Sequence, residues 1–235
     1  MANPAAEEAE EAAAACREGG SGPSSPSATE AGPGGGGAGV VQQLEPDSKS
    51  SGLTYKKSDK GGSTEVAVDD ENHVIYIRTN MEFSGPDATE EYAAAAKKQI
   101  EETWSGTAER NGEPYEVKVT VNTKVNTSGE PTEGYDPIVV DKSVGRMNQT
   151  LFGAGPGNQT PEAATDEGRP RRIAHEYGHT LGLEDGYEDS PEGGSVKKDP
   201  TKENDIMAET WPDESGVLPH PHQDHYDEVL KTHGW

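Results

Sequence analysis

Residues 175–185 have the sequence His-Glu-Tyr-Gly-His-Thr-Leu-Gly-Leu-Glu-Asp, which contains H-E-x-x-H followed by x-x-G-x-x-D. In a helix, His175 and His179 lie on one face because residues four apart are neighbours on the helix surface. Two imidazoles placed in this way can bind one zinc ion, Zn2+, and Glu176 can reach a water molecule on that ion. The segment therefore predicts a zinc site carried by a helix.

The residues after the second histidine offer a third ligand. Gly182 stands where the helix is expected to end, and glycine readily takes the left-handed conformation that turns the chain. After such a turn, Asp185 can come back towards the two imidazoles. Three other candidates lie further along the chain, at His220, His222 and His225. The sequence leaves the choice between Asp185 and one of these histidines open.

The helix itself has a start signal and an apolar face. Pro170 precedes the motif, and proline is tolerated in a first helical turn. A largely apolar set is expected to face inward: Ile173, Ala174, Tyr177, Thr180 and Leu181. We therefore expect a helix that begins near Pro170, ends near Gly182 and packs against the core.

The pattern H-E-x-x-H-x-x-G-x-x-D resembles the zinc signature of the metzincin metallopeptidases, and more narrowly the snapalysin-like variant with aspartate in place of the third histidine. That family also has a tight turn with a methionine beneath the metal, and residues 204–208 (Asn-Asp-Ile-Met-Ala) are similar to it. By position, the resemblance implies that His175, His179 and Asp185 are the zinc ligands. It also implies that Glu176 is the general base and that Met207 lies under the site.

The chain departs from some metzincins at one position. These carry a tyrosine two residues after the turn methionine, where it can approach the metal, whereas this chain has Glu209. Tyr187 and Tyr226 are candidates to replace that tyrosine, but nothing in the sequence places either of them near the metal.

The implied ligand set predicts a catalytic site. Three protein ligands leave the fourth zinc position to water, and zinc lowers the pKa of that water to about 7. Glu176 would take a proton as the water attacks the scissile carbonyl and pass it to the leaving amine. We therefore expect a zinc-dependent endopeptidase. The alternative is a non-catalytic relative of the metzincins that binds zinc or a peptide.

Composition divides the chain into two parts. Residues 1–52 consist mainly of alanine, glutamate, glycine, serine and proline, and they offer almost nothing to bury, so we expect a disordered, low-complexity leader. The single cysteine, Cys16, lies in this leader, which excludes an internal disulfide. Residues 53–235 are long enough to bury a full core, and we expect them to form the metallopeptidase catalytic domain.

The chain is strongly acidic. It carries 44 acidic and 20 basic residues, with a formal net charge of −24. This charge argues against nucleic acid or an anionic membrane surface as a partner. No run of about 18 apolar residues is present, so we expect no membrane insertion. A protein or peptide is the expected substrate.

The layout of a Gly- and Pro-rich leader joined to a small metallopeptidase resembles the toxin modules of bacterial polymorphic toxins. This resemblance implies an immunity or inhibitor protein as a further partner. No secretory signal is recognisable, so we expect secretion or delivery by a non-classical route, with action in the cytoplasm of the producing cell as the alternative.

Outside the zinc motif, the sequence predicts a mixed α/β body. Apolar or alternating runs indicate strands over residues 65–68, 73–77, 115–121 and 136–141. Asp87 is expected to cap a helix that runs to about Thr103, with Gly106 as its stop and a buried face of Tyr92, Ala96, Ile100 and Trp104. A short amphipathic helix is expected over residues 224–231.

The order of these elements resembles the metzincin layout. It is an α+β fold, in which a twisted mixed sheet with a packing helix is followed by the zinc-binding helix, the methionine turn and a C-terminal helix. An edge strand of such a sheet can bind an extended peptide by strand addition. We expect this edge within residues 138–153.

Overall fold

The computed structural model describes residues 52–58, 60, 62–143, 147–153, 171–191, 194–210 and 216–235. All of them belong to one compact unit, Gln42–Trp235. Apart from Gly52, the expected leader lies outside the described residues, and so do Cys16 and Pro170. The boundary between the leader and the catalytic domain therefore stays a prediction.

The described residues form an α+β fold with one large mixed sheet. Its strands are β1 Lys56–Lys57, β2 Glu65–Asp69, β3 Val74–Ser84, β4 Gly106–Arg110, β5 Glu113–Val125, β6 Asp136–Val140 and β7 Leu151–Phe152. The long central strand β3 pairs antiparallel with β2 and parallel with β5. The last residues of β3 pair parallel with β6, which pairs parallel with β7. β1 and β4 extend the sheet beside β2 and β5.

The four strands expected from the sequence are present. The runs at residues 65–68 and 73–77 form the antiparallel hairpin β2–β3. Residues 115–121 are the middle of β5, and residues 136–141 correspond to β6. The expected edge segment, residues 138–153, contributes most of β6 and the short outer strand β7.

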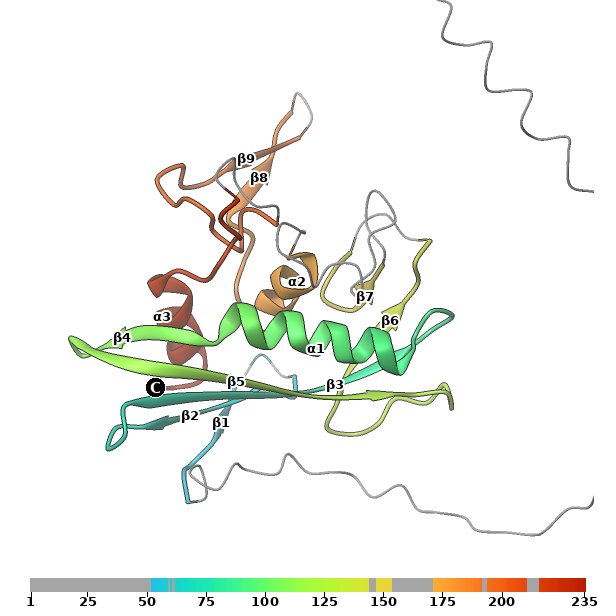
Figure 1. The fold of residues 1–235 in the computed structure, drawn as a ribbon, viewed down its shortest axis with the longest axis horizontal. Coiled ribbons are helices and arrows are strands. Elements are labelled where there is room, and N and C mark those ends of the chain that lie inside the picture. Colours follow the sequence, from blue (N-terminus) through green and yellow to red (C-terminus); the bar gives the residue numbers. More distant parts are fainter. Residues whose placement is uncertain are drawn as a thin grey trace, which may run out of the picture. The chain divides into compact units, whose positions relative to one another are not determined.

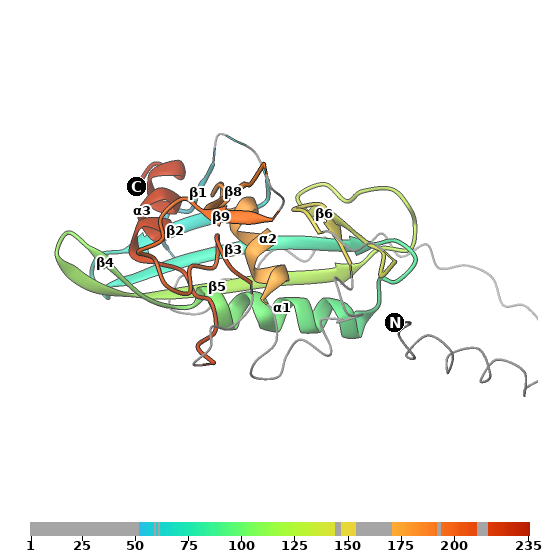
Figure 2. The same ribbon diagram turned by 90° about the horizontal axis from the view of Figure 1, so that it is seen from above.

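Three helices occur in the described part of the chain, α1 Glu90–Trp104, α2 Arg172–Thr180 and α3 Gln223–Thr232. All three lie on the same side of the sheet, with α1 running along it and α2 beside α1 (Figure 1). Figure 2 shows the same helices from above. None of the helices in the described ranges is long and apolar enough to cross a membrane.

Helix α1 buries the face expected from its four-residue spacing, because Tyr92, Ala96, Ile100 and Trp104 are all fully buried. Its expected last residue, about Thr103, lies within one residue of the observed end at Trp104, but the expected cap and stop residues are wrong. Thr89 is the N-cap, since its side chain accepts the N–H of Tyr92. Asp87 instead accepts the backbone N–H of Lys142, 55 residues away. At the other end, Ser105 is already extended, so Gly106 begins β4 rather than ending the helix.

Helix α2 is fixed to its neighbours by three buried polar contacts. The Trp104 indole donates to the carbonyl of Ala174 at 2.8 Å, and the Ala174 N–H donates to the side chain of Gln99 at 3.2 Å. The hydroxyls of Tyr177 and Thr79 lie 2.8 Å apart, which ties α2 to β3. Since buried polar groups need such partners, these contacts define where α2 sits.

The chain after α2 forms a hairpin against the methionine turn. Its strands are β8 Tyr187–Asp189 and β9 Ser195–Lys197. The Gly186 N–H donates to the carbonyl of Met207 at 2.7 Å, and the Lys198 N–H donates to the carbonyl of Gly186 at 2.8 Å. A Cβ on Gly186 would lie 3.1 Å from the Cβ of Ala208, so glycine permits this close approach.

A buried carboxylate anchors the loop that follows β5. The Glu82 side chain is 3% exposed and lies 2.7 Å from the Lys124 ammonium. It also accepts hydrogen bonds from the Asn126 amide at 2.7 Å and the Thr132 N–H at 3.2 Å. Burial acts to raise the pKa of Glu82, but the hydrogen bonds from Lys124, Thr132 and Asn126 outweigh it and hold the pKa at about 2.

The low pKa of Glu82 predicts an acid-sensitive contribution to stability. Because the folded pKa lies below the unfolded value of 4.5, the contribution is present above pH 4.5 and is lost as the pH falls towards 2. We expect the free energy of unfolding of the wild type to fall by about 3 kcal/mol more than that of Glu82→Gln across this range. Denaturant unfolding at stepped pH measures it. The exposed Glu113→Gln is the control, and equal pH dependence of the wild type and Glu82→Gln would contradict the prediction.

Candidate metal centre

The motif helix ends at a glycine, as the sequence predicts. Gly182 has φ +93°, the left-handed conformation that glycine adopts without strain. The Leu183 N–H donates to the carbonyl of Gly178 at 3.1 Å, and the Gly182 N–H donates to the carbonyl of His179 at 3.0 Å. These two bonds form a Schellman motif, which satisfies the last carbonyls of α2 and turns the chain back.

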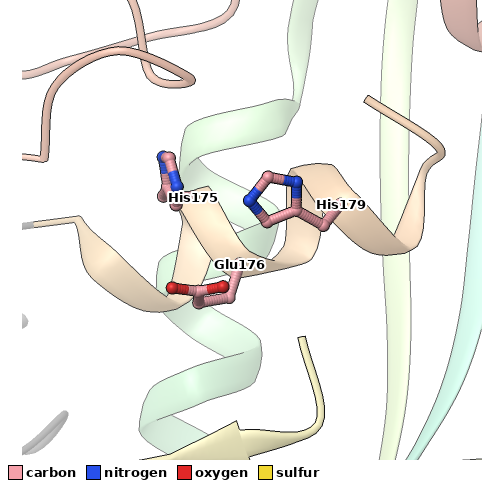
Figure 3. A group of neighbouring side chains, drawn as sticks. All are labelled: His175, Glu176 and His179. Carbon is pink, nitrogen blue, oxygen red and sulfur yellow. The ribbon is translucent and has the colours of Figure 1, made fainter. Parts of the chain in front are cut away.

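This turn brings a carboxylate to both imidazoles. The Oδ1 atom of Asp185 lies 3.2 Å from the Nε2 atom of His175 and 3.2 Å from the Nε2 atom of His179. The two rings are nearly perpendicular, with centroids 5.0 Å apart. Figure 3 shows both imidazoles together on one side of α2, with Glu176 extending from the same helix beside them.

Backbone carbonyls determine the tautomer of both rings, that is, which ring nitrogen carries the proton when the ring is neutral. The Nδ1 atom of His175 lies 2.7 Å from the carbonyl oxygen of Ile206, and the Nδ1 atom of His179 lies 2.9 Å from that of Leu183. A carbonyl can only accept, so Nδ1 carries the proton and a neutral ring leaves the lone pair on Nε2. Burial lowers the pKa of His175, which favours the neutral ring.

On neutral rings three lone-pair atoms therefore face one another, which is unfavourable unless a cation, or a proton on one of the nitrogens, lies between them. The Oδ1 atom of Asp185 is buried and has no hydrogen-bond donor. Zinc–ligand bonds of 2.0–2.2 Å in a tetrahedron place ligand atoms about 3.3 Å apart. The 3.2 Å distances match this spacing. Carbonyl acceptors behind ligating histidines are also usual at metal sites. The residues present fit a zinc ion.

Glu176 is the second carboxylate of the site. His175, Glu176 and His179 each bring one potential ligand atom within 4.8 Å of the others. Asp185 approaches the two imidazoles to 3.2 Å, so two carboxylates, Asp185 and Glu176, lie at the imidazole pair. One helical turn earlier, burial lowers the pKa of the Arg172 guanidinium, and the nearby Glu176 carboxylate opposes that shift.

The methionine turn lies against α2 between the two histidines. Met207 is buried, and a Cβ on Gly178 would come within 2.3 Å of the Met207 Sδ atom. The preceding residue, Ile206, supplies the carbonyl that orients His175. Sequence reasoning missed the role of Gly178. The signal was a glycine inside a helix, where it costs about 1 kcal/mol relative to alanine and therefore calls for a packing reason.

The three alternative ligands have other contacts. The Nδ1 atom of His220 lies 3.3 Å from the carbonyl oxygen of Leu218, and the Nε2 atom of His222 lies 3.0 Å from that of Glu203. His225 lies with its Nε2 atom 3.3 Å from the Oδ1 atom of Asp205. These contacts hold the three rings beside residues 203–205 and 218.

An open cavity of about 450 Å³ exposes the candidate centre. It is lined by residues of three segments, which are His175, Glu176, His179 and Asp185 of the motif, Met147, Asn148 and Gln149 of the expected edge segment, and Lys60. Tyr187 also lines it, with its ring stacked beside His175 at a centroid distance of 6.2 Å. Tyr226 instead donates its hydroxyl to the Trp104 carbonyl within the core.

Comparison of the chain with protein-family models, with curated proteins and with solved structures gives no match. The interpretation of the site therefore rests on its own geometry.

Because Met207 packs on Gly178, we predict that alanine at position 178 destabilises the protein, although alanine usually stabilises a helix. Alanine favours a helix by about 1 kcal/mol over glycine, but overpacking a buried contact costs about 1–3 kcal/mol. We expect the clash to dominate, so Gly178→Ala lowers the free energy of unfolding by about 1–2 kcal/mol. In a Met207→Ala background the loss should be smaller, because only the contact of the new Cβ with the Trp104 ring, at 3.0 Å, then remains. Denaturant unfolding of the four proteins measures this, and an equal loss in both backgrounds would exclude the contact as the cause.

Proposed function

We propose that this protein is a zinc-dependent endopeptidase with a metzincin-like, snapalysin-like catalytic domain. One observation carries the proposal, namely that the Nε2 atoms of His175 and His179 and the Oδ1 atom of Asp185 converge at 3.2 Å with Glu176 beside them. The order of elements supports the metzincin assignment, since a mixed sheet and α1 precede the motif helix, and Met207 and α3 follow it.

His175, His179 and Asp185 would hold the zinc ion. When bound, zinc supplies Lewis acidity that lowers the pKa of water and polarises a carbonyl group. The carbonyls of Ile206 and Leu183 hold both rings so that their Nε2 atoms face Asp185, where they would hold the ion. The protein therefore provides ligands whose orientation is set before the metal arrives.

Glu176 would act as the general base and then as the general acid. Its carboxylate takes one proton from the attacking water while the carbon–oxygen bond forms. It then gives that proton to the amine nitrogen as the carbon–nitrogen bond breaks. Tyr187 lines the same cavity beside His175, whereas Glu209 forms an ion pair with Lys197. These positions support Tyr187 as the tyrosine that would contact a substrate.

A protein or peptide in extended conformation is the proposed substrate. Residues 147–149 line the cavity next to the outer strand β7. The N–H and carbonyl of Leu151 in β7 already pair with Asn148, so an extended peptide would lie along residues 147–149 rather than pair with β7 itself. The resemblance to polymorphic-toxin modules adds the proposals of an immunity or inhibitor protein and of delivery by a non-classical route. The competing function is a relative that binds zinc or a peptide without hydrolysis, which Glu209 in place of the family tyrosine favours.

Zinc content and proteolysis of matched variants test the proposal. We expect the wild type to hold about one zinc ion per chain and to cleave casein, with a chelator abolishing cleavage and added zinc restoring it. Glu176→Gln should keep its zinc but lose about 10²–10⁴-fold in rate, because only the base is removed. Asp185→Ala should lose both zinc and activity.

Two results would count against this function. A wild type that binds no zinc excludes the metal centre altogether. A wild type that binds zinc with the expected stoichiometry but cleaves no protein or peptide supports the non-catalytic relative instead.

A further inference from the structure

A second buried acid–imidazole pair lies behind the methionine turn. Asp205 is 3% exposed, and its Oδ1 atom accepts the N–H of Met207 at 2.8 Å. The same oxygen lies 3.3 Å from the Nε2 atom of His225 on α3. An aspartate that accepts the N–H two residues ahead closes an Asx turn, so this carboxylate shapes the backbone of residues 205–207.

The protonation of His225 follows from its other nitrogen. The backbone N–H of His222 donates to the Nδ1 atom of His225 at 3.0 Å, so Nδ1 is an acceptor. On a neutral ring the proton is therefore on Nε2, the atom that faces Asp205. Burial lowers the pKa of His225, while Asp205 and Asp224 oppose that shift.

The turn that Asp205 closes also orients a candidate metal ligand. Ile206, between Asp205 and Met207, places its carbonyl oxygen 2.7 Å from the Nδ1 atom of His175. The Ile206 N–H donates to the carbonyl of His220 at 3.1 Å, and the His220 N–H donates to that of Asn204 at 2.8 Å. The peptide that holds His175 is thus supported from the side of α3.

A neutral side chain could close the same turn, which makes a carboxylate here informative. An Asx turn needs only an acceptor oxygen, and asparagine or serine would supply one. Burying a carboxylate costs free energy unless charges or donors compensate it. His225 lies 3.3 Å away, and the pKa of Lys202 is raised chiefly by its hydrogen bond with Asp224, with a smaller contribution from the charge of Asp205. The carboxylate therefore joins α3 to the turn electrostatically.

We propose that Asp205 and His225 are positioning residues for the metal centre, which hold the Ile206 carbonyl in place and thereby aim His175 at the ion. The inference rests on the proposed function, because it concerns the affinity of the proposed zinc site. Neither residue lines the cavity that exposes the candidate centre. The coupling runs from α3 through the Asx turn to the Nδ1 atom of His175.

Two substitutions at His225 separate its two contacts. His225→Asn places an amide oxygen near the position of Nδ1, so it keeps the acceptor for the His222 N–H and loses the N–H towards Asp205. His225→Gln places an amide N–H near the position of Nε2, so it keeps the donor towards Asp205 and loses the acceptor. Asp205→Asn keeps an acceptor for Met207 and removes the charge.

The test is the dissociation constant for Zn2+ of the metal-free, full-length protein, measured by competition with a chromophoric chelator. Substitutions behind a metal ligand typically weaken metal binding by 10–100-fold, so we expect about a tenfold loss for His225→Asn and for Asp205→Asn. His225→Gln should bind zinc about as tightly as the wild type. The double variant His225→Asn/Asp205→Asn should bind no more weakly than the weaker single variant, because the pair acts as a unit. Unfolding of each metal-free protein reports stability separately.

The outcomes distinguish this inference from the proposed function. If the wild type binds zinc and cleaves protein, and His225→Asn and Asp205→Asn bind zinc as tightly as the wild type does, only this inference is overturned. Equal losses for His225→Asn and His225→Gln that track their stabilities also overturn it, since they show a purely structural role. A wild type without zinc overturns both. If His225→Asn does not fold, Asp205→Asn decides between these outcomes by the same titration.

Discussion

The candidate centre is governed by electrostatic repulsion among three acceptor atoms. The Nε2 atoms of two imidazoles face one carboxylate oxygen at 3.2 Å, and that oxygen is buried without a hydrogen-bond partner. The backbone enforces this arrangement, because a backbone carbonyl oxygen accepts a hydrogen bond at the Nδ1 atom of each ring. A protein interior tolerates facing acceptors only when a positive charge offsets them. The motif helix, its terminal glycine and the methionine turn all serve to hold these atoms together.

Local rules made much of this arrangement predictable. The spacing of His175 and His179, the turn at Gly182 and the hairpin of β2 and β3 each depend on a few neighbouring residues. Errors arose where a distant partner decides the outcome. Asp87 does not cap α1, because it accepts an N–H from a residue 55 positions away, and Thr89 takes the cap.

The third ligand was open for the same reason. Asp185 and the histidines at 220, 222 and 225 can each bind zinc, and only the folded chain shows that Asp185 lies at both imidazoles. The contact of Gly178 with Met207, and that of Asp205 with His225, join segments about 20–30 residues apart, so no local pattern reveals them.

Helix α2 spans only nine residues, Arg172–Thr180. Helices shorter than about 12 residues are marginal in water, so this one depends on its links to α1 and β3. In a nascent chain, before those partners have assembled, the two histidines have no fixed separation and form no chelate. The capacity of this helix to hold a metal ion would thus arise only with the completed native state.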